Sequence, residues 1–197
     1  MARGLPILPL LALVPFLVAL AGCTPGPSGE AYLYVVAPLT GDMASRGQEV
    51  AGGARLRAEE VNRQGGVLGK RVVVRALDDG ADEEMAVEAA RQVAAAVRRG
   101  EPILGVVGHY NSGATGPALD QVYKDLDLVV ITPGSTNATL TQKGYSRFFR
   151  VCSTDDIQGP VAARKALSLG WMRIAVFHTD NLYARGLAAA FVGGLRE

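Results

Sequence analysis

The chain has 197 residues, 49% of them hydrophobic and 6% aromatic, and its 20 basic side chains nearly balance its 19 acidic ones. A near-neutral chain without a block of basic residues has no electrostatic basis for binding nucleic acid, so we expect no nucleic-acid partner. The length is sufficient for one full domain with a hydrophobic core.

The N-terminus has the pattern of a secretory signal peptide, which we assign to residues 1–22. One positive residue, Arg3, precedes an apolar run from Leu5 to Leu20 that three prolines interrupt. This run is shorter than the stretch of about 20 apolar residues that a membrane-spanning helix needs. It therefore predicts export of the protein.

The signal ends in the tetrapeptide LAGC, which resembles the bacterial lipobox, where the cysteine receives lipid and becomes the new N-terminus. We expect lipidation at Cys23; the alternative is an ordinary signal peptide that is cleaved nearby. Residues 23–30 are rich in Pro, Gly and Ser and are predicted to form a flexible tether. Removing the first 22 residues takes away only one charged side chain, so the mature chain is formally neutral.

Five apolar or β-branched runs have the length of strands, and most are continuous rather than alternating. Continuous runs are typical of strands in a parallel sheet that is buried on both faces. The predicted strands are Ala31–Pro38, Arg71–Asp79, Ile103–Gly108, Leu128–Pro133 and Arg173–Thr179.

Helical patterns separate these runs, because apolar residues between them recur every three or four positions. After the fourth strand, helices are predicted in residues 154–170 and from Tyr183 onward, with Thr154 and Asp155 as candidate N-terminal caps. The alternation of strand and helix predicts an α/β fold with a doubly wound parallel sheet. One segment departs from it: Gly134–Cys152 is a long polar loop leading to a short apolar run, and such loops are more often functional than idle.

In open α/β sheets, ligands bind beyond the carboxyl ends of the strands. The loops after the third and fourth predicted strands, HYNSGAT and GSTNAT, are dense in Ser, Thr, Asn and Gly. The first resembles a nucleotide phosphate loop in the spacing of Gly108, Gly113 and Thr115. However, Ala114 stands where that loop needs a lysine to reach the outer phosphates, so we reject nucleotide binding.

Catalytic and metal sites have little support in the sequence. Ser112, His178 and Asp180 could form a nucleophilic triad, but no G-x-S-x-G nucleophile motif occurs. The acidic run DDGADEE lacks the spacing of a calcium loop and suits the start of a helix, where the helix dipole favours carboxylates. We therefore expect no enzyme activity, no cofactor and no metal.

A non-covalent binding site fits the two polar loops best. Ser112 and the free backbone amides of a helix that begins near Gly113 form an anion site. The next loop offers the carbonyl of Gly134 and the hydroxyls of Ser135 and Thr136. Donors on one side and acceptors on the other suit a carboxylate beside an ammonium, so the predicted ligand is an amino acid or a similar small carboxylate. For Ser112 or Thr136 taken alone, a local turn or cap is the simpler interpretation.

Three segments recur together in one known family. They are VNRQGGVLGKRVVVRALDDGAD, VVGHYNSGATGPALDQVYKDLDLVVITPGSTNATLT and DDIQGPVAARKAL, in the same order and at the same intervals. From Ala31 to its end the chain thereby resembles the periplasmic leucine/isoleucine/valine-binding proteins, which are type I periplasmic binding proteins of ABC importers. The resemblance implies two α/β lobes that close around a ligand, with a first lobe over residues 31–154 and an incomplete second lobe over residues 155–197.

The resemblance also implies roles for individual residues. Ser112 would bind the ligand carboxylate. Gly134 and Thr136, with Ser135 between them, would hold the ammonium and the carboxylate, and Tyr183 would close over the ligand from the second lobe.

Two further residues are candidates for ligand contact. Tyr110 stands two positions before Ser112 in the same loop. Arg46 stands where the branched-chain binders place an aromatic residue against the ligand side chain. It would either pair with a polar or acidic ligand side chain or turn to solvent.

Together these features predict a lipid-anchored substrate-binding protein on the periplasmic side or outer surface of a bacterial membrane. It would capture an amino acid, branched-chain or related, and deliver it to the permease subunits of an ABC importer. Two alternatives stay open: a ligand-sensing domain of the same fold in signalling, and a hydrolase that uses Ser112.

Overall fold

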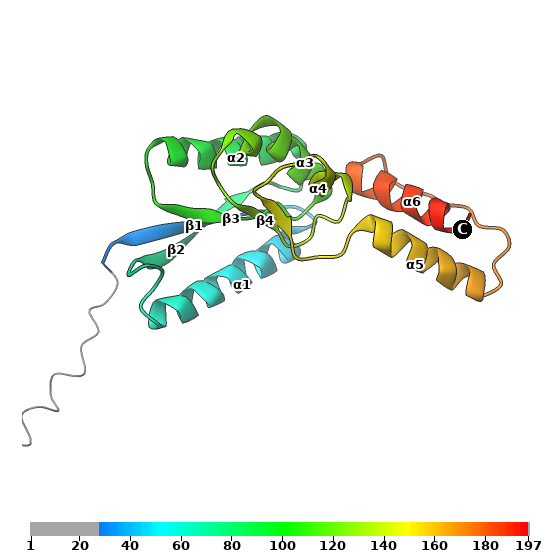
Figure 1. The fold of residues 1–197 in the computed structure, drawn as a ribbon, viewed down its shortest axis with the longest axis horizontal. Helices are drawn as coiled ribbons and strands as arrows, with labels where there is room; N and C mark the ends of the chain where they lie inside the picture. Colours follow the sequence, from blue (N-terminus) through cyan, green and yellow to red (C-terminus); the bar gives the residue numbers. More distant parts are fainter. Residues whose placement is uncertain (1–27, 197) are drawn as a thin grey trace, which may run out of the picture.

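The structure is a computed structural model that describes residues 28–196. Five parallel strands form one sheet in the order β2-β1-β3-β4-β5 (Figure 1). The strands are β1 (Glu30–Ala37), β2 (Arg71–Asp78), β3 (Ile103–Gly108), β4 (Val130–Thr132) and β5 (Phe148–Arg150). The helices are α1 (Ala44–Arg63), α2 (Glu83–Arg98), α3 (Ser112–Gln121), α4 (Thr139–Gln142), α5 (Asp155–Ser168) and α6 (Leu182–Gly194), with a short 3-10 turn at Tyr123–Asp125.

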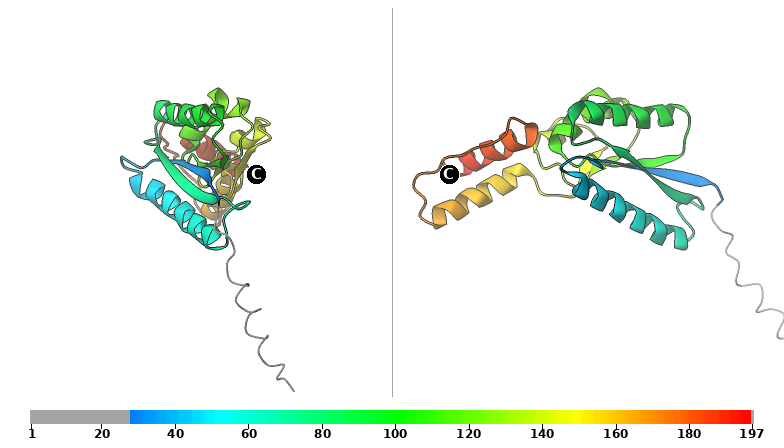
Figure 2. Two further views of the ribbon diagram at one scale, coloured as in Figure 1. Left: turned by 90° about the vertical axis from the view of Figure 1, so that its left-hand side faces the viewer. Right: turned by 180° about the vertical axis from the view of Figure 1, so that it is seen from behind.

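Helices cover both faces of the sheet. α1 lies on one face, and α2 and α3 lie on the other (Figure 1, Figure 2). From β1 the chain adds β2 on one side and then β3, β4 and β5 on the other. The strand order therefore reverses between β1 and β3, and ligands in sheets of this type bind in the crevice outside the carboxyl ends at this point. The predicted doubly wound α/β fold is confirmed.

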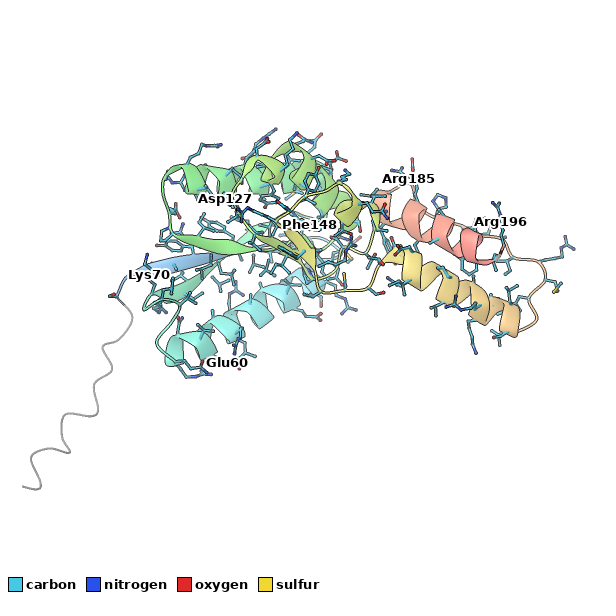
Figure 3. The ribbon with its side chains drawn as sticks, viewed as in Figure 1. Glu60, Lys70, Asp127, Phe148, Arg185 and Arg196 are labelled. Atoms are coloured by element: carbon cyan, nitrogen blue, oxygen red, sulfur yellow. The ribbon has the colours of Figure 1, made fainter. Side chains whose placement is uncertain are left out.

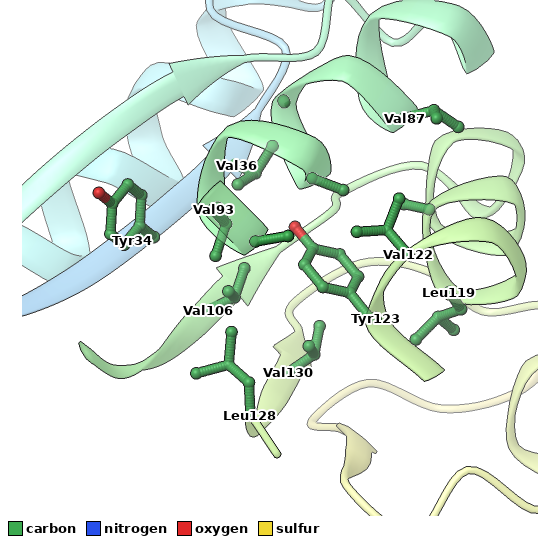
Figure 4. Packing of buried hydrophobic residues seen from close by; sticks show 14 of the residues in the cluster. Tyr34, Val36, Val87, Val93, Val106, Leu119, Val122, Tyr123, Leu128 and Val130 are labelled. Carbon is green, nitrogen blue, oxygen red and sulfur yellow. The ribbon is translucent and has the colours of Figure 1, made fainter. Parts of the chain in front are cut away.

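The larger hydrophobic core lies between the sheet and the layer of α2 and α3. Val36 and Val106 from the strands meet Val93, Leu119 and Tyr123 from the helical layer (Figure 4). These side chains are between 0% and 4% exposed. Because full burial of a Val or Leu side chain contributes about 1.5–3 kcal/mol, this cluster holds α3 firmly against the sheet.

A smaller cluster, built around Val35, Ala37 and Ala51, lies under α1. The start of α1 approaches the end of β1 closely at Gly47, where a Cβ atom would stand 1.9 Å from the carbonyl oxygen of Pro38. Only glycine permits this approach, which sets the first turn of α1 at the carboxyl edge of the sheet.

Four of the five predicted strands are confirmed as β1 to β4, with ends that differ by at most two residues. The sequence missed α4 and β5, which lie inside the predicted loop Gly134–Cys152. Both are short, and β5 is a strand because Phe148 and Phe149 pair with Val130 and Ile131 of β4.

The predicted strand Arg173–Thr179 is wrong, since this segment has no regular secondary structure. A strand requires backbone hydrogen bonds to a neighbouring strand. The sheet ends at β5 and β2, and no strand within residues 28–196 lies beside this segment. Its side chains are mostly exposed, with Phe177 93% accessible to solvent.

The helices α5 and α6 pack against each other and extend away from the sheet (Figure 1, Figure 2). Their contact depends on Gly159, where a Cβ atom would stand 2.5 Å from the backbone of Ala190. The two predicted helices in this part of the chain are confirmed. We call residues 30–150 the sheet lobe and residues 155–196 the outer segment. In Figure 3, Phe148 marks the interior of the sheet lobe, Arg185 marks α6, and Arg196 lies just after the end of α6.

The predicted signal peptide, Cys23 and most of the tether lie outside the described residues. Among the helices of residues 28–196, none combines the length and the apolar character that crossing a membrane requires.

Candidate ligand-binding site

The first part of the site is the start of α3, directly after β3. Asn111 occupies the N-cap position with extended backbone angles, but its side chain does not cap the helix. Its carbonyl accepts the amides of Ala114 and Thr115. The amides of Ser112 and Gly113 donate to no group within the described part of the chain. They are therefore free to bind an anion, which the helix dipole also favours.

The second part is the loop Gly134–Asn137, directly after β4. The Asn137 amide donates to the Ser112 hydroxyl oxygen at 3.2 Å, so this loop lies against the start of α3. The Arg150 guanidinium donates to the carbonyl oxygens of Ser135 and Asn137 at 2.9 and 3.0 Å. The carbonyl of Gly134 accepts no hydrogen bond from the residues that the structure describes. The hydrogen bonds of Asn137 and Arg150 hold the loop in place, and the Gly134 carbonyl oxygen remains an unused acceptor.

Beneath both loops, His109 is completely buried and forms a hub of hydrogen bonds. Its Nδ1 lies 2.8 Å from a carboxylate oxygen of Asp79, which is also fully buried. Its carbonyl accepts the hydroxyls of Thr132 at 2.6 Å and of Ser135 at 3.2 Å. The hub therefore connects the ends of β2, β3 and β4.

The phenol of Tyr123 lies next to this hub, with its oxygen 3.4 Å from Nε2 of His109. Burial raises the pKa of Tyr123 far above its ordinary value, and the nearby carboxylate of Asp79 adds to the effect. The phenol is therefore neutral at any physiological pH.

The structure indicates that Ser135 has a structural role and not the predicted role in ligand contact. It is completely buried, and its hydroxyl lies 2.5 Å from the Thr115 hydroxyl and also bonds the carbonyls of His109 and Tyr110. These bonds point its hydroxyl into the lobe, so Ser135 shapes the loop and its hydroxyl does not face the ligand side.

Thr136 and Asp155 carry polar atoms without partners. The Thr136 hydroxyl and both carboxylate oxygens of Asp155 are buried and make no well-formed hydrogen bond within residues 28–196. The Asp155 amide donates to the Thr136 carbonyl at 2.9 Å, so the two residues are adjacent. Burial raises the pKa of Asp155, while the nearby Thr136 hydroxyl and the Arg150 guanidinium oppose that rise.

The sequence pointed to Asp155 only as a candidate helix cap, and it missed Arg150 altogether. A carboxylate at the first position of α5, immediately after the polar loop, was the available signal for Asp155. Nothing in the sequence pattern distinguished Arg150 from the other arginines on the surface.

Tyr110 lies in contact with the second loop. A Cβ atom on Gly134 would stand 2.7 Å from Cε2 of the Tyr110 ring, so glycine is required for the ring to cover this loop. Tyr110 is half-buried and belongs to the same set of loops as Ser112 and Thr136.

Arg46 and Tyr183 lie outside this set of contacts. Arg46, in the first turn of α1, pairs with Glu49 at 3.1 Å and has a side chain 60% exposed. Tyr183, in the first turn of α6, is 43% exposed and lines a cavity of about 440 Å³ with Phe177 and Phe191. The structure therefore brings neither side chain to Ser112 or Thr136.

A surface pocket of about 550 Å³ lies beside α3, between Gly113 and the start of α6 at Leu182. Ser112 and Thr136 do not line it. Within residues 28–196, no three His, Cys, Asp or Glu side chains gather in a way that could hold a metal ion.

These features describe an α/β lobe in which free amides after β3 and a free carbonyl and an unbonded hydroxyl after β4 lie on adjoining loops. The chain belongs to the periplasmic binding protein family, whose sequence profile matches residues 35–197. The resemblance to the Leu/Ile/Val-binding proteins is confirmed by several relatives.

A Leu/Ile/Val-binding protein of Rhizobium johnstonii is 34% identical over 194 residues, which cover 95% of this chain and 51% of the relative. A leucine-specific-binding protein of Salmonella typhimurium is 34% identical over 92% of this chain and 48% of its own length. The chain thus spans about half the length of the curated relatives that it matches.

Solved structures of binding proteins are also similar to this chain, in fold as well as in sequence. A substrate-binding protein of an ABC transporter from Desulfitobacterium hafniense, in complex with Leu, is 31% identical with a TM-score of 0.69, covering 85% of this chain and 47% of that one. A leucine-binding protein from Thermotoga maritima is 29% identical with a TM-score of 0.73, covering 84% of this chain and 45% of that one.

Proposed function

We propose that this protein is the extracytoplasmic substrate-binding protein of an ABC importer and that it binds an amino acid, branched-chain or related. The observation that carries the proposal is the pairing of free donors with free acceptors on two adjoining loops. The amides of Ser112 and Gly113 are unused donors, and the Gly134 carbonyl and the Thr136 hydroxyl are unused acceptors.

The ligand carboxylate would lie at the start of α3. There it would accept the amides of Ser112 and Gly113 and the proton of the Ser112 hydroxyl, whose oxygen already accepts the Asn137 amide. The ligand ammonium would donate to the Gly134 carbonyl and to the Thr136 oxygen. The fixed loop geometry means that little ordering is needed on binding, which favours affinity.

Within residues 28–196, the Ser112 hydroxyl has no hydrogen bond to a side chain that could act as a base. A nucleophilic serine needs a base within hydrogen-bonding reach. Nδ1 of His109 is hydrogen-bonded to the carboxylate of Asp79. His178 is exposed, and its ring is hydrogen-bonded to the carbonyl of Thr179. We therefore propose that Ser112 binds the ligand and catalyses no reaction.

The ligand's side chain would be covered by residues that are not yet in contact with these loops. Tyr110 lies over Gly134 and would line the ligand on one side. Tyr183 would approach from the outer segment, and Arg46 would face either a polar ligand side chain or solvent. Several relatives are named for leucine, isoleucine and valine, which favours an aliphatic ligand.

We further propose that residues 31–154 form the first lobe and residues 155–197 begin the second, with ligand held between them. The predicted signal peptide and lipidation at Cys23 would place the protein at the periplasmic or outer face of a bacterial membrane. There it would deliver its ligand to the permease subunits. A chain anchored by lipid near a flexible tether is suited to that delivery.

A ligand screen by thermal shift tests the proposal on the protein as its source organism expresses it. An amino acid at 100 times its dissociation constant should stabilise the protein by about 2.7 kcal/mol. Ser112→Ala and Thr136→Ala should each weaken binding by about 1.5–3 kcal/mol, the usual contribution of a hydrogen bond to a charged group.

Ser146→Ala is the matched control, because Ser146 is an exposed serine between α4 and β5 and should not affect binding. No shift with any amino acid or small carboxylate would refute the ligand class. Turnover of an ester or amide that disappears in Ser112→Ala would instead support the hydrolase.

A further inference from the structure

We propose that Asn137 holds the start of α6 in a position that keeps Tyr183 away from the ligand site, and that releasing this contact tightens ligand binding. We call the position of α6 in this structure the resting position. The inference rests on the proposed function, since it concerns the approach of Tyr183 to a bound amino acid. Asn137 is a positioning residue, because its side chain acts through α6 and does not contact the ligand.

Asn137 is 3% exposed and forms hydrogen bonds to both parts of the molecule. Its backbone amide donates to the Ser112 hydroxyl oxygen at 3.2 Å, within the sheet lobe. Its side-chain Nδ2 donates to the carbonyl of Leu182 at 2.9 Å, in the first turn of α6. Buried polar groups in native proteins are nearly always hydrogen-bonded, so leaving this donor without its acceptor is costly. The bond therefore fixes the start of α6 against the ligand loop.

The orientation of the Asn137 side chain is fixed by Thr139. The backbone amide and the hydroxyl of Thr139 donate to Oδ1 of Asn137 at 3.0 and 2.6 Å. Because Oδ1 is the acceptor of the side-chain amide and Nδ2 is its donor, these bonds leave Nδ2 to face α6. The side chain is thus held in the orientation that the Leu182 carbonyl requires.

α6 has a glycine at the point where the Asn137 side chain approaches it. A Cβ atom on Gly186 would stand 2.4 Å from Nδ2 of Asn137, which is too close for any side chain. Gly186 follows Leu182 by four residues, so both lie on one face of the helix. An alanine at this position would favour the helix but would push the Asn137 side chain away.

The side chain of Leu182 adds an apolar contact to this hydrogen bond. The first turn of α6 lies beside α3 (Figure 1), and Leu182 packs against the main hydrophobic cluster of the sheet lobe. A Cβ atom on Gly116 of α3 would stand 3.2 Å from Cδ2 of Leu182. Leu182 therefore lies in the space that α3 leaves free at Gly116. We call this apolar contact and the bond from Asn137 to Leu182 the α6 latch.

The α6 latch determines where Tyr183 lies. Tyr183 follows Leu182 directly, is 43% exposed and lines the cavity of about 440 Å³ with Phe177 and Phe191. The backbone of a helix fixes the direction in which each side chain leaves it. Tyr183 therefore reaches a ligand at Ser112 only when the first turn of α6 moves, and that movement breaks the latch.

A latch on the resting position opposes ligand binding. When only a fraction of the molecules is in the position that binds ligand fully, the apparent dissociation constant rises in inverse proportion to that fraction. The α6 latch lowers the fraction, because its hydrogen bond and its apolar contact form in the resting position. The affinity of the wild-type protein is therefore weaker than the site itself allows.

The test measures leucine binding by titration calorimetry on the wild-type protein, as its source organism expresses it, and on three variants. Asn137→Ala removes the side-chain bond to α6 and keeps the backbone amide that donates to Ser112. Leu182→Ala removes the apolar contact without changing the sheet lobe, so it tests the latch even if Asn137→Ala does not fold. Thr139→Val is the matched control, because it removes a bond to the Asn137 side chain on the sheet-lobe side only.

Asn137→Ala and Leu182→Ala should each bind leucine about two- to tenfold more tightly than the wild-type protein, on the scale of one hydrogen bond. Thr139→Val should bind leucine as the wild-type protein does. The direction of the change is decisive, because a variant that only damages the structure of the site binds its ligand more weakly. Unchanged or weaker binding in both Asn137→Ala and Leu182→Ala would overturn the inference, and so would an equal gain of affinity in Thr139→Val.

Hydrogen exchange without ligand separates this inference from the proposed function. Loss of the latch should speed exchange of the amides of residues 185–190 in α6 about two- to tenfold, while β1 and β3 stay protected. Unchanged exchange in both Asn137→Ala and Leu182→Ala would refute the latch even if leucine binds. If exchange is faster in both variants but no amino acid binds any of the proteins, the latch stands and the proposed function is wrong.

Discussion

The sheet lobe and the outer segment contain similar apolar sequences but bury them very differently. In the sheet lobe, Val106 of β3 is 1% exposed, since β1 and β4 flank its strand and helices cover it. In the outer segment, Val176 is 38% exposed and Phe177 is 93% exposed. The runs ILGVVG and RIAVFHT are both rich in β-branched residues, yet only the first is a strand.

The difference shows that β-branched apolar composition is a preference and that a neighbouring strand is the condition for a strand to form. Strand propensity largely measures how well a side chain packs on a pleated, half-buried surface. Where no neighbouring strand supplies that surface, the same composition leaves an exposed apolar segment. The outer segment of residues 155–196 therefore owes its order to the contact between α5 and α6 and to bonds with the sheet lobe.

The largest expected effect contrasts one leucine from each region. Leu119→Ala removes a side chain that is 2% exposed in the main core and should lower the free energy of unfolding by about 2–5 kcal/mol. Leu167→Ala removes one that is 46% exposed on α5 and should change it by less than about 0.5 kcal/mol. Urea denaturation followed by circular dichroism measures both. Equal losses would mean that Leu167 is packed against a surface outside residues 28–196.

A smaller effect is expected at the contact between the two outer helices. Gly159→Ala places a methyl group where the backbone of Ala190 stands and should destabilise the packing of α5 on α6 by about 1–3 kcal/mol. Gly193→Ala is the matched control, because no atom lies within 4 Å of the added Cβ. It should stabilise α6 by up to about 1 kcal/mol.

Hydrogen exchange of the amides in α5 and α6 measures this effect locally. Gly159→Ala should speed exchange in both helices while β1 and β3 stay protected. If β1 and β3 lost protection equally, the sheet lobe and the outer segment would unfold as one unit, and the contrast between them would not hold.

The smallest expected effect is the pH dependence of the stability that Asp78 contributes. Asp78 ends β2 and accepts the Leu39 amide at 2.6 Å, the Thr40 hydroxyl at 2.5 Å and the Gly80 amide at 2.9 Å. Burial alone would raise the pKa of Asp78, but these donors outweigh it and hold the pKa below its ordinary value. The group's stabilising effect is therefore fully present above the unfolded-state pKa of about 3.9 and is lost as pH falls through the lower folded-state pKa.

Asp78→Asn should accordingly cost about 1 kcal/mol at neutral pH, and the difference from the wild-type protein should fade near pH 3. Asp180→Asn in the outer segment is the control, because its ion pair with Arg185 is exposed and such pairs contribute little. Urea denaturation at pH 7 and pH 3 makes the comparison. A difference at Asp78 that persists unchanged at pH 3 would contradict the sign of the pKa shift.

The fold was predictable where local pattern and tertiary environment agree. The continuous apolar runs form β1 to β4, and segments whose apolar residues recur every three or four positions form helices. In the sheet lobe, both kinds of element bury their apolar side chains in the core. The predictions failed at β5, which is only three residues long, and at residues 173–179, where the pattern has no neighbouring strand.

The candidate site was predictable only in its loops. Polar loops after adjacent strands pointed to Ser112, Gly134 and Thr136, and the structure places these loops side by side. The sequence could not show that the hydroxyl of Ser135 turns inward. It also could not show that Asp155, which follows a linker, returns to lie against Thr136.

The hydrogen bonds of Arg150 also affect how the two parts of the molecule could move. It is the last residue of β5, and its guanidinium grips both carbonyls that flank Thr136. The loop Gly134–Asn137 is thereby joined to the point where the chain leaves the sheet lobe. A rotation of α5 and α6 relative to the sheet would then be absorbed by the four residues 151–154, and the loop Gly134–Asn137 would keep its shape while the outer helices move.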